Sequence, residues 1–235
     1  MIAARYRSLD DAEITRTLQR LESRIAERFP ESGLRKVCKE LIAVSDETKE
    51  CAEFLRSPHW PIRIGVGVTI GAMIVVLVMA ATTEGLPGGW GEIDSAKNSV
   101  VFLGVAAFFL LSIEPRFKRR RALTVVHQLR SLAHVIDMHQ LTKDPERLLS
   151  PEGATSSPPE PTMDPLKLGR YLDYCSELLS VTSKLSALLV QYFNDPVLLG
   201  AVDEIETLTT GLSGKIWQKI QLLDSGHGYQ PRPKT

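Results

Sequence analysis

Apolar positions recur every three or four residues over most of the chain, which is the period of an amphipathic α-helix. Before residue 58 this pattern predicts a helical hairpin over 1–57, with capping residues around Ser8 and a Phe-Pro-Glu-Ser-Gly break at 29–33. Stripes this narrow are typical of helices in bundles and coiled coils. They consist of Ile14, Leu18, Leu21 and Ile25, and then of Leu34, Val37, Leu41, Val44, Thr48, Cys51 and Leu55.

The same period returns in the second half of the chain. It predicts a basic juxtamembrane helix over 116–149, a proline- and serine-rich linker over 150–163 and a helical hairpin over 164–224. An Asn-Asp-Pro turn at 194–196 divides that hairpin, and we expect 225–235 to be disordered. Six residues from both halves should carry the packing: Leu34, Leu41, Leu178, Leu185, Ile205 and Leu212.

Between these amphipathic helices lie two segments that are apolar on all sides. Residues 64–83 contain no charge, which is enough to cross about 30 Å of hydrocarbon as a helix. Residues 98–113 are also uncharged, and they can span if Lys97 reaches back to the surface. We therefore predict a transmembrane hairpin over 58–115, with spans at about 62–82 and 98–114 and an outer loop at 83–97. A buried core helix is the alternative.

No alternating strand pattern occurs outside these segments. The predicted fold class is all-α: a two-span transmembrane helical hairpin with cytoplasmic amphipathic helices that form a bundle or a coiled-coil-like domain. Gly67 and Gly71, four residues apart in the first span, form a small-residue face, with Gly65 beside it in the sequence. Small residues let helix backbones approach closely in lipid, so this face serves either self-association or packing on the second span near Gly104 or Ala107.

The distribution of basic residues predicts the orientation. The loop 84–97 carries one lysine and three acids, whereas basic residues precede the first span and a dense run, RFKRRR, follows the second. Both termini should therefore be cytoplasmic, as in a multi-pass protein of a bacterial inner membrane. The first residues lack an apolar core, so we expect no cleavable signal peptide. The run itself fixes topology or binds anionic lipid through Arg116, Lys118, Arg119, Arg120 and Arg121.

Two acids in the predicted outer loop, Glu92 and Asp94, could attract cations at a pore mouth. The layout is similar to that of the mitochondrial calcium uniporter: two spans, an acidic loop with a tryptophan, and cytoplasmic coiled coils. In the uniporter the two acids lie one helical turn apart after the tryptophan, whereas here they are two residues apart and Lys97 follows. The uniporter function is therefore not carried over, and a solvated loop is the simpler interpretation.

A histidine-rich stretch follows the basic run, with His127, His134, Asp137, Met138 and His139. Imidazole beside a carboxylate can bind metal, but this spacing matches no metal signature, so we interpret it as a polar seam. The three cysteines are widely spaced on helical stripes. They should be reduced, packed thiols rather than a disulfide framework or a zinc site.

No nucleotide-binding, zinc-protease or nucleophile-elbow motif occurs, so we expect neither an enzyme nor a cofactor. The chain has 28 basic and 28 acidic residues, a balance that argues against nucleic-acid binding. The expected partners are membrane lipid and either further copies of the chain or an unidentified membrane or cytoplasmic protein. The sequence thus favours a membrane scaffold or accessory subunit with a cytoplasmic interaction module. The alternative is an oligomeric ion channel or membrane-permeabilising effector gated by the cytoplasmic helices.

Overall fold

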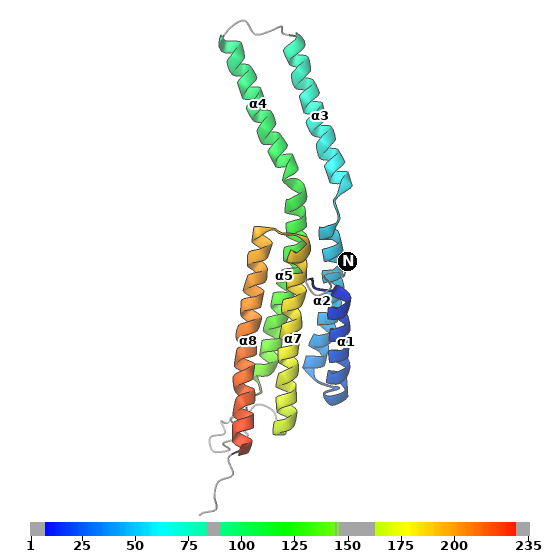
Figure 1. Cartoon of the computed structure of the whole chain (residues 1–235), viewed down its shortest axis with the longest axis vertical. Helices are drawn as coiled ribbons and strands as arrows, with labels where there is room; N and C mark the ends of the chain where they lie inside the picture. Colours follow the sequence, from blue (N-terminus) through cyan, green and yellow to red (C-terminus); the bar gives the residue numbers. More distant parts are fainter. Residues whose placement is uncertain (1–7, 84–89, 144, 146–162, 229–235) are drawn as a thin grey trace, which may run out of the picture. The chain divides into compact units, whose positions relative to one another are not determined.

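The computed structural model describes residues 8–83, 90–143, 145 and 163–228. The side chains at 77, 80, 81, 83, 90–100 and 226–228 lie outside that description. Within the described residues the chain forms helices and no strand, which confirms the all-α class for them. The helices, labelled in Figure 1, are α1 (Asp11–Arg28), α2 (Gly33–Arg56), α3 (Trp60–Thr83), α4 (Trp90–Leu111), α5 (Ile113–Leu141), α7 (Pro165–Tyr192) and α8 (Pro196–Gly228).

The chain divides into two compact units. The first combines Met1–Arg56 with Ala122–Thr235, and the second runs from Ser57 to Arg121. The first unit is a helical bundle in which α7 packs against α1, α2 and α8 (Figure 1). Segments from both sides of the apolar hairpin therefore share one hydrophobic core.

The core of the bundle follows the predicted stripes. The four stripe residues of α1 and the seven of α2 are all buried. In α5 the buried stripe runs from Ala122 to Ile136, and α7 is buried along most of its length. The six residues expected to carry the packing are all buried: Leu34, Leu41, Leu178, Leu185, Ile205 and Leu212. The helical period thus correctly predicted which faces are removed from water.

Local hydrogen bonds explain where several helices begin. The Asp10 carboxylate accepts hydrogen bonds from two backbone N–H groups in the first turn of α1, the nearer of them that of Ala12 at 2.9 Å. Asp195, which is buried, caps α8 in the same way through the N–H groups of Val197 and Leu198, both at 3.1 Å. Each cap satisfies donors that have no partner inside the helix.

Helix α5 is joined to α8 by side chains. Arg130 donates to the Glu204 carboxylate at 2.8 Å. Further along, the Lys219 ammonium donates to the backbone carbonyls of Gln140 (2.9 Å) and Lys143 (3.1 Å). Because the last carbonyls of a helix lack intrahelical donors, Lys219 stabilises the C-terminal end of α5.

In the second unit, α3 corresponds closely to the predicted first span at 62–82. It supplies the apolar part of Gly33–Val76, the one candidate within the described residues that is long and apolar enough to cross a membrane, and the apolar window is not buried. Large exposed side chains along α3 include Val68, Val76 and Met79. Helices α3 and α4 pack against each other.

Several helix boundaries differ from the sequence-based predictions. Helix α4 begins at Trp90, within the predicted outer loop 83–97, because no proline or glycine occurs between Gly91 and Gly104 to oppose a helix. It ends at Leu111 and α5 begins at Ile113. Pro115 explains this interruption, since it has no N–H to donate to the carbonyl four residues earlier.

Helix α5 ends at Leu141, just before the Lys-Asp-Pro stretch at 143–145 and within the predicted segment 116–149. At the other end of the chain, α8 continues to Gly228, so residues 225–228 are helical and not disordered. The Ser225 hydroxyl donates to the Gln221 carbonyl in this last part of the helix. The predicted linker 150–163 lies outside the described residues except for Met163, as do 229–235.

Candidate functional site

A charged cluster joins the two ends of the second unit. Glu114, in the first turn of α5, accepts a hydrogen bond at 2.8 Å from Nε of Arg63, in the first turn of α3. The backbone N–H of His59 donates to the other carboxylate oxygen at 3.3 Å. The Glu114 side chain is only 14% exposed. A carboxylate that is partly withdrawn from water thus holds the entry of α3 beside the start of α5.

Lys118 completes this cluster one helical turn after Glu114. Its ammonium lies 3.3 Å from Glu114 Oε1 and donates to the Ser57 carbonyl at 2.9 Å. The side chain is 10% exposed, so Lys118 points inward rather than toward solvent. We call the five residues Ser57, His59, Arg63, Glu114 and Lys118 the Glu114 clasp.

The surroundings of the Glu114 carboxylate favour its ionised form. The Glu114 carboxylate accepts hydrogen bonds from Arg63 and from the His59 N–H, and the Lys118 ammonium lies 3.3 Å from it. Because donors to a carboxylate stabilise its ionised form, the clasp stays intact at every pH near neutrality.

The structure separates the five predicted basic residues into different environments. Lys118 belongs to the clasp, and Arg119 is half-buried. Arg116, Arg120 and Arg121 are exposed. The Arg116 guanidinium lies 5.6 Å from the centre of the Phe109 ring, near the end of α4. The predicted set is therefore not one uniform cationic surface.

The small-residue face of α3 is open. A β-carbon added at Gly65, Gly67 or Gly71 would meet no atom within 4 Å, and the same holds for Gly104 of α4. Packing of this face on the second span near Gly104 or Ala107 stays a prediction, although α3 and α4 do contact each other. The other alternative, self-association, also stays a prediction.

The two acids of the predicted outer loop fall within the helical backbone of α4, which begins at Trp90. The side chains of Glu92 and Asp94 lie outside the described residues. Their proposed attraction for cations stays a prediction.

The histidines and Asp137 in the histidine-rich part of α5 have different environments and do not form one cluster. His127 and His134 are exposed, and Asp137 accepts a hydrogen bond from Gln140 Nε2 at 2.6 Å. His139 is half-buried, and burial, helped by Lys143, lowers its pKa below 6.5. Among the described residues no group of three or more His, Cys, Asp and Glu is placed to hold a metal ion.

The three cysteines are packed inside the bundle, as the stripes predict. Cys38, Cys51 and Cys175 are all buried and none forms a disulfide. Burial raises the pKa of both Cys38 and Cys175 to about 12. Since the thiolate is the reactive form, these two thiols are poor nucleophiles at neutral pH.

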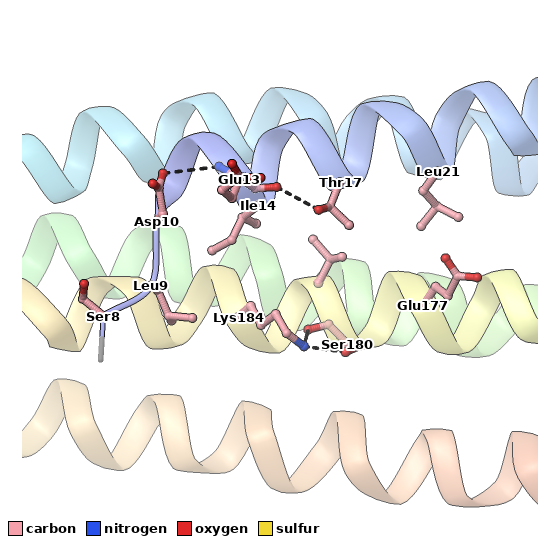
Figure 2. A pocket seen from close by; sticks show the side chains of 11 residues that line it. Ser8, Leu9, Asp10, Glu13, Ile14, Thr17, Leu21, Glu177, Ser180 and Lys184 are labelled. Carbon is pink, nitrogen blue, oxygen red and sulfur yellow. Dashed lines mark hydrogen bonds between the residues drawn. The ribbon is translucent and has the colours of Figure 1, made fainter. Parts of the chain in front are cut away.

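A groove that sequence reasoning missed lies between α1 and α7 (Figure 2). Its volume is about 700 Å³. At one end the Gln191 side chain holds the backbone of Leu9, accepting from its N–H at 2.7 Å and donating to its carbonyl at 3.2 Å. At the other end Glu177 is paired with Arg24. Gln191 and Leu9 are far apart in sequence, so no local signal predicts the pair.

The lining of this groove does not form a catalytic arrangement. Lys184 donates to the Ser180 hydroxyl at 2.7 Å, as Figure 2 shows. A serine–lysine pair works as nucleophile and base where the lysine is desolvated, but Lys184 is exposed. Among the lining residues there is neither histidine nor cysteine. The groove therefore offers mixed polar and apolar walls and no activated nucleophile.

Comparison with known proteins finds no match: no family model, no curated protein and no solved structure is significantly similar to this chain. The function is therefore inferred from the residues and their geometry. Two features carry this inference, the bundle formed by both flanks of the apolar hairpin and the Glu114 clasp at the base of that hairpin.

Proposed function

We propose that this chain is a non-enzymatic integral membrane protein that presents a helical protein-interaction module, as a scaffold or an accessory subunit. The observation that carries this proposal is the composition of the bundle, in which α1 and α2 share a core with α7 and α8. If α3 and α4 both cross a bilayer, the two flanking segments return to the same side and can build that core. A single crossing would separate them.

The cytoplasmic side of a bacterial inner membrane fits the charges best. Basic residues flank both ends of the uncharged segments on the side of the bundle, whereas the connection between the spans carries more acids than bases. Lys and Arg are retained on the cytoplasmic side during insertion. The clasp adds a local reason for pairing the spans, because it fastens the start of α3 to the residues that follow α4.

The surface of the bundle supports an interaction role. Trp217 of α8 is 59% exposed, and Leu166 of α7 is 75% exposed. Large apolar side chains that stay in water in the isolated chain are common anchors of protein interfaces, and tryptophan is the most enriched of them. Such residues fit a module that binds another protein better than a surface evolved only for solubility.

Self-association of the spans is part of the proposal. The open face at Gly67 and Gly71 would let a second helix approach α3 closely. The same observation favours the second candidate function, an oligomeric ion channel or membrane-permeabilising effector. Two spans per chain cannot enclose a pore, so that function requires a ring of several copies.

The proposal is tested by locating both ends of the full-length chain. Tags at the two termini, probed with protease in right-side-out and inverted membrane vesicles, should both be cleaved only where the cytoplasmic face is accessible. The chain should also remain in the membrane after extraction with alkaline carbonate. Tags on opposite sides, or release of the chain by carbonate, would refute the two-span topology.

The two candidate functions differ in what accompanies the protein. Native mass spectrometry from nanodiscs, after cross-linking in cells, should reveal a stoichiometric partner for a scaffold and a closed ring for a channel. Only a channel should release ions from proteoliposomes. In either case Gly67→Leu with Gly71→Leu should weaken self-association, whereas Val68→Leu, at an exposed position of α3, should not. Unchanged assembly in the glycine variant would remove this face from the interface.

A further inference from the structure

The first turns of α5 present two different basic faces. A helix turns about 100° per residue, so residues four apart share a face and residues two apart lie nearly opposite. Glu114 and Lys118 share the face that forms the clasp. Arg116 and Arg120 share the other face, and both are exposed. The basic run is thus divided by the clasp into an inward lysine and an outward arginine pair.

The outward pair lies where the apolar segment ends. The Arg116 guanidinium covers the Phe109 ring, and the Phe109 side chain is itself 54% exposed. The neighbouring Phe108 and Phe117 are also exposed. If that helix spans a bilayer as proposed, a cation stacked on an aromatic ring at its end would lie at the depth of the lipid phosphates, with its apolar stem against the acyl chains.

We propose that Arg116 and Arg120 form a binding face for the headgroup of an anionic phospholipid in the cytoplasmic leaflet. Lys118 does not take part, because its side chain is only 10% exposed and points toward Glu114 and the Ser57 carbonyl, whereas Arg116 and Arg120 are exposed. Charge complementarity identifies the occupant: two guanidiniums one turn apart offer paired donors to phosphate oxygens, and the adjoining aromatic surface suits a lipid rather than free phosphate. This inference rests on the proposed membrane insertion.

The test compares three basic residues of one run. The full-length protein is placed in nanodiscs of phosphatidylcholine with a minor fraction of phosphatidylglycerol, and the lipids retained on the released protein are counted by native mass spectrometry. Arg116→Gln and Arg120→Gln should each reduce the enrichment of phosphatidylglycerol about five-fold, and the double variant about twenty-fold or more. Lys118→Gln, the matched control, should keep the enrichment while lowering the thermal midpoint of the protein.

Equal loss of phosphatidylglycerol in Lys118→Gln and Arg116→Gln would overturn the division between the two faces, and so would full enrichment in the double glutamine variant. If a glutamine variant fails to insert, the paired Arg116→Lys and Arg120→Lys substitutions preserve the charge and should retain most of the enrichment. The wild-type protein provides a second measurement, because raising the salt concentration to 1 M should abolish the enrichment. Persistence at 1 M would contradict the electrostatic face.

These results are distinguishable from failure of the proposed function. A wild-type chain that alkaline carbonate releases from membranes is not an integral membrane protein, and both proposals then fail. A chain that stays in the membrane but shows no preference for phosphatidylglycerol loses the lipid face alone.

Discussion

Gly33 and His139 lie in direct apposition: a β-carbon on Gly33 would be 2.3 Å from Cε1 of His139. The first residue of α2 therefore receives the side chain of a residue near the end of α5. This contact links a helix that precedes the apolar hairpin to one that follows it, and glycine is required there for space.

Gly33→Ala should destabilise the bundle by about 1 kcal/mol, within the usual range for a clash that a neighbour partly relieves. Thermal unfolding of the full chain in mild detergent, followed by circular dichroism, measures the change. Gly200→Ala in α8 is the control, because its β-carbon would meet nothing within 4 Å and alanine is the better helix former. A stabilised Gly33→Ala variant would show that His139 yields without cost.

Acidification should weaken the bundle through His139. Its folded-state pKa is lowered by burial, with repulsion from Lys143 as the smaller cause, so the unfolded chain binds the proton more readily. The stability linked to this residue is therefore complete above pH 6.5 and is lost as the pH falls from 6.5 toward the lower folded value. The thermal midpoint should drop between pH 7.5 and 5, and less steeply in His139→Gln. His134→Gln, at an exposed position, should keep the wild-type slope.

Leu178 lies fully buried in α7, the helix that contacts α1, α2 and α8. Leu178→Ala removes apolar contacts and leaves a cavity, so the free energy of unfolding should fall by about 2–5 kcal/mol. Leu166→Ala on the same helix should change it by less than about 0.5 kcal/mol, since Leu166 is 75% exposed. Similar losses in both variants, measured by denaturant titration, would contradict the assignment of α7 as the core helix.

Asp195 caps α8 from a buried position. Asp195→Ala should cost about 1–2 kcal/mol, because two N–H groups lose their acceptor. Asp195→Asn keeps a side-chain oxygen and should retain most of the stability. Comparison of the two thermal midpoints checks this, and an asparagine variant as unstable as the alanine variant would show that the negative charge, rather than the acceptor, is what matters.

The buried faces of the bundle could be predicted from the sequence because the helical period alone determines them. Leu41 and Leu185 belong to stripes whose members recur every three or four residues, and removing such a stripe from water is the main driving force for packing. The turns at 29–33 and 194–196 are also predictable from the sequence, since proline, glycine and aspartate favour helix ends through their own backbone and side-chain preferences.

The Glu114 clasp could not be predicted from helical periodicity alone. The spacing of Glu114 and Lys118 is that of a helical ion pair, and it was a signal available in the sequence. Their partners, Arg63 and the Ser57 carbonyl, come from the other side of the hairpin and can be placed only once the helices are. Charge predicts where a span should begin but not where its helix begins, and α4 starts at Trp90 because no proline interrupts the residues between it and the span.

The mixed origin of the bundle core has a consequence for biosynthesis. Helices α1 and α2 leave the ribosome long before α7, yet α7 covers part of both. The parts of their apolar stripes that α7 covers stay exposed until α7 is made, and under the proposed topology the hairpin would enter the membrane in that interval. A chain that inserted one apolar segment instead of two would keep the halves of its core in different compartments. Under the proposed topology, a chain with only one inserted segment would be unable to complete the bundle core.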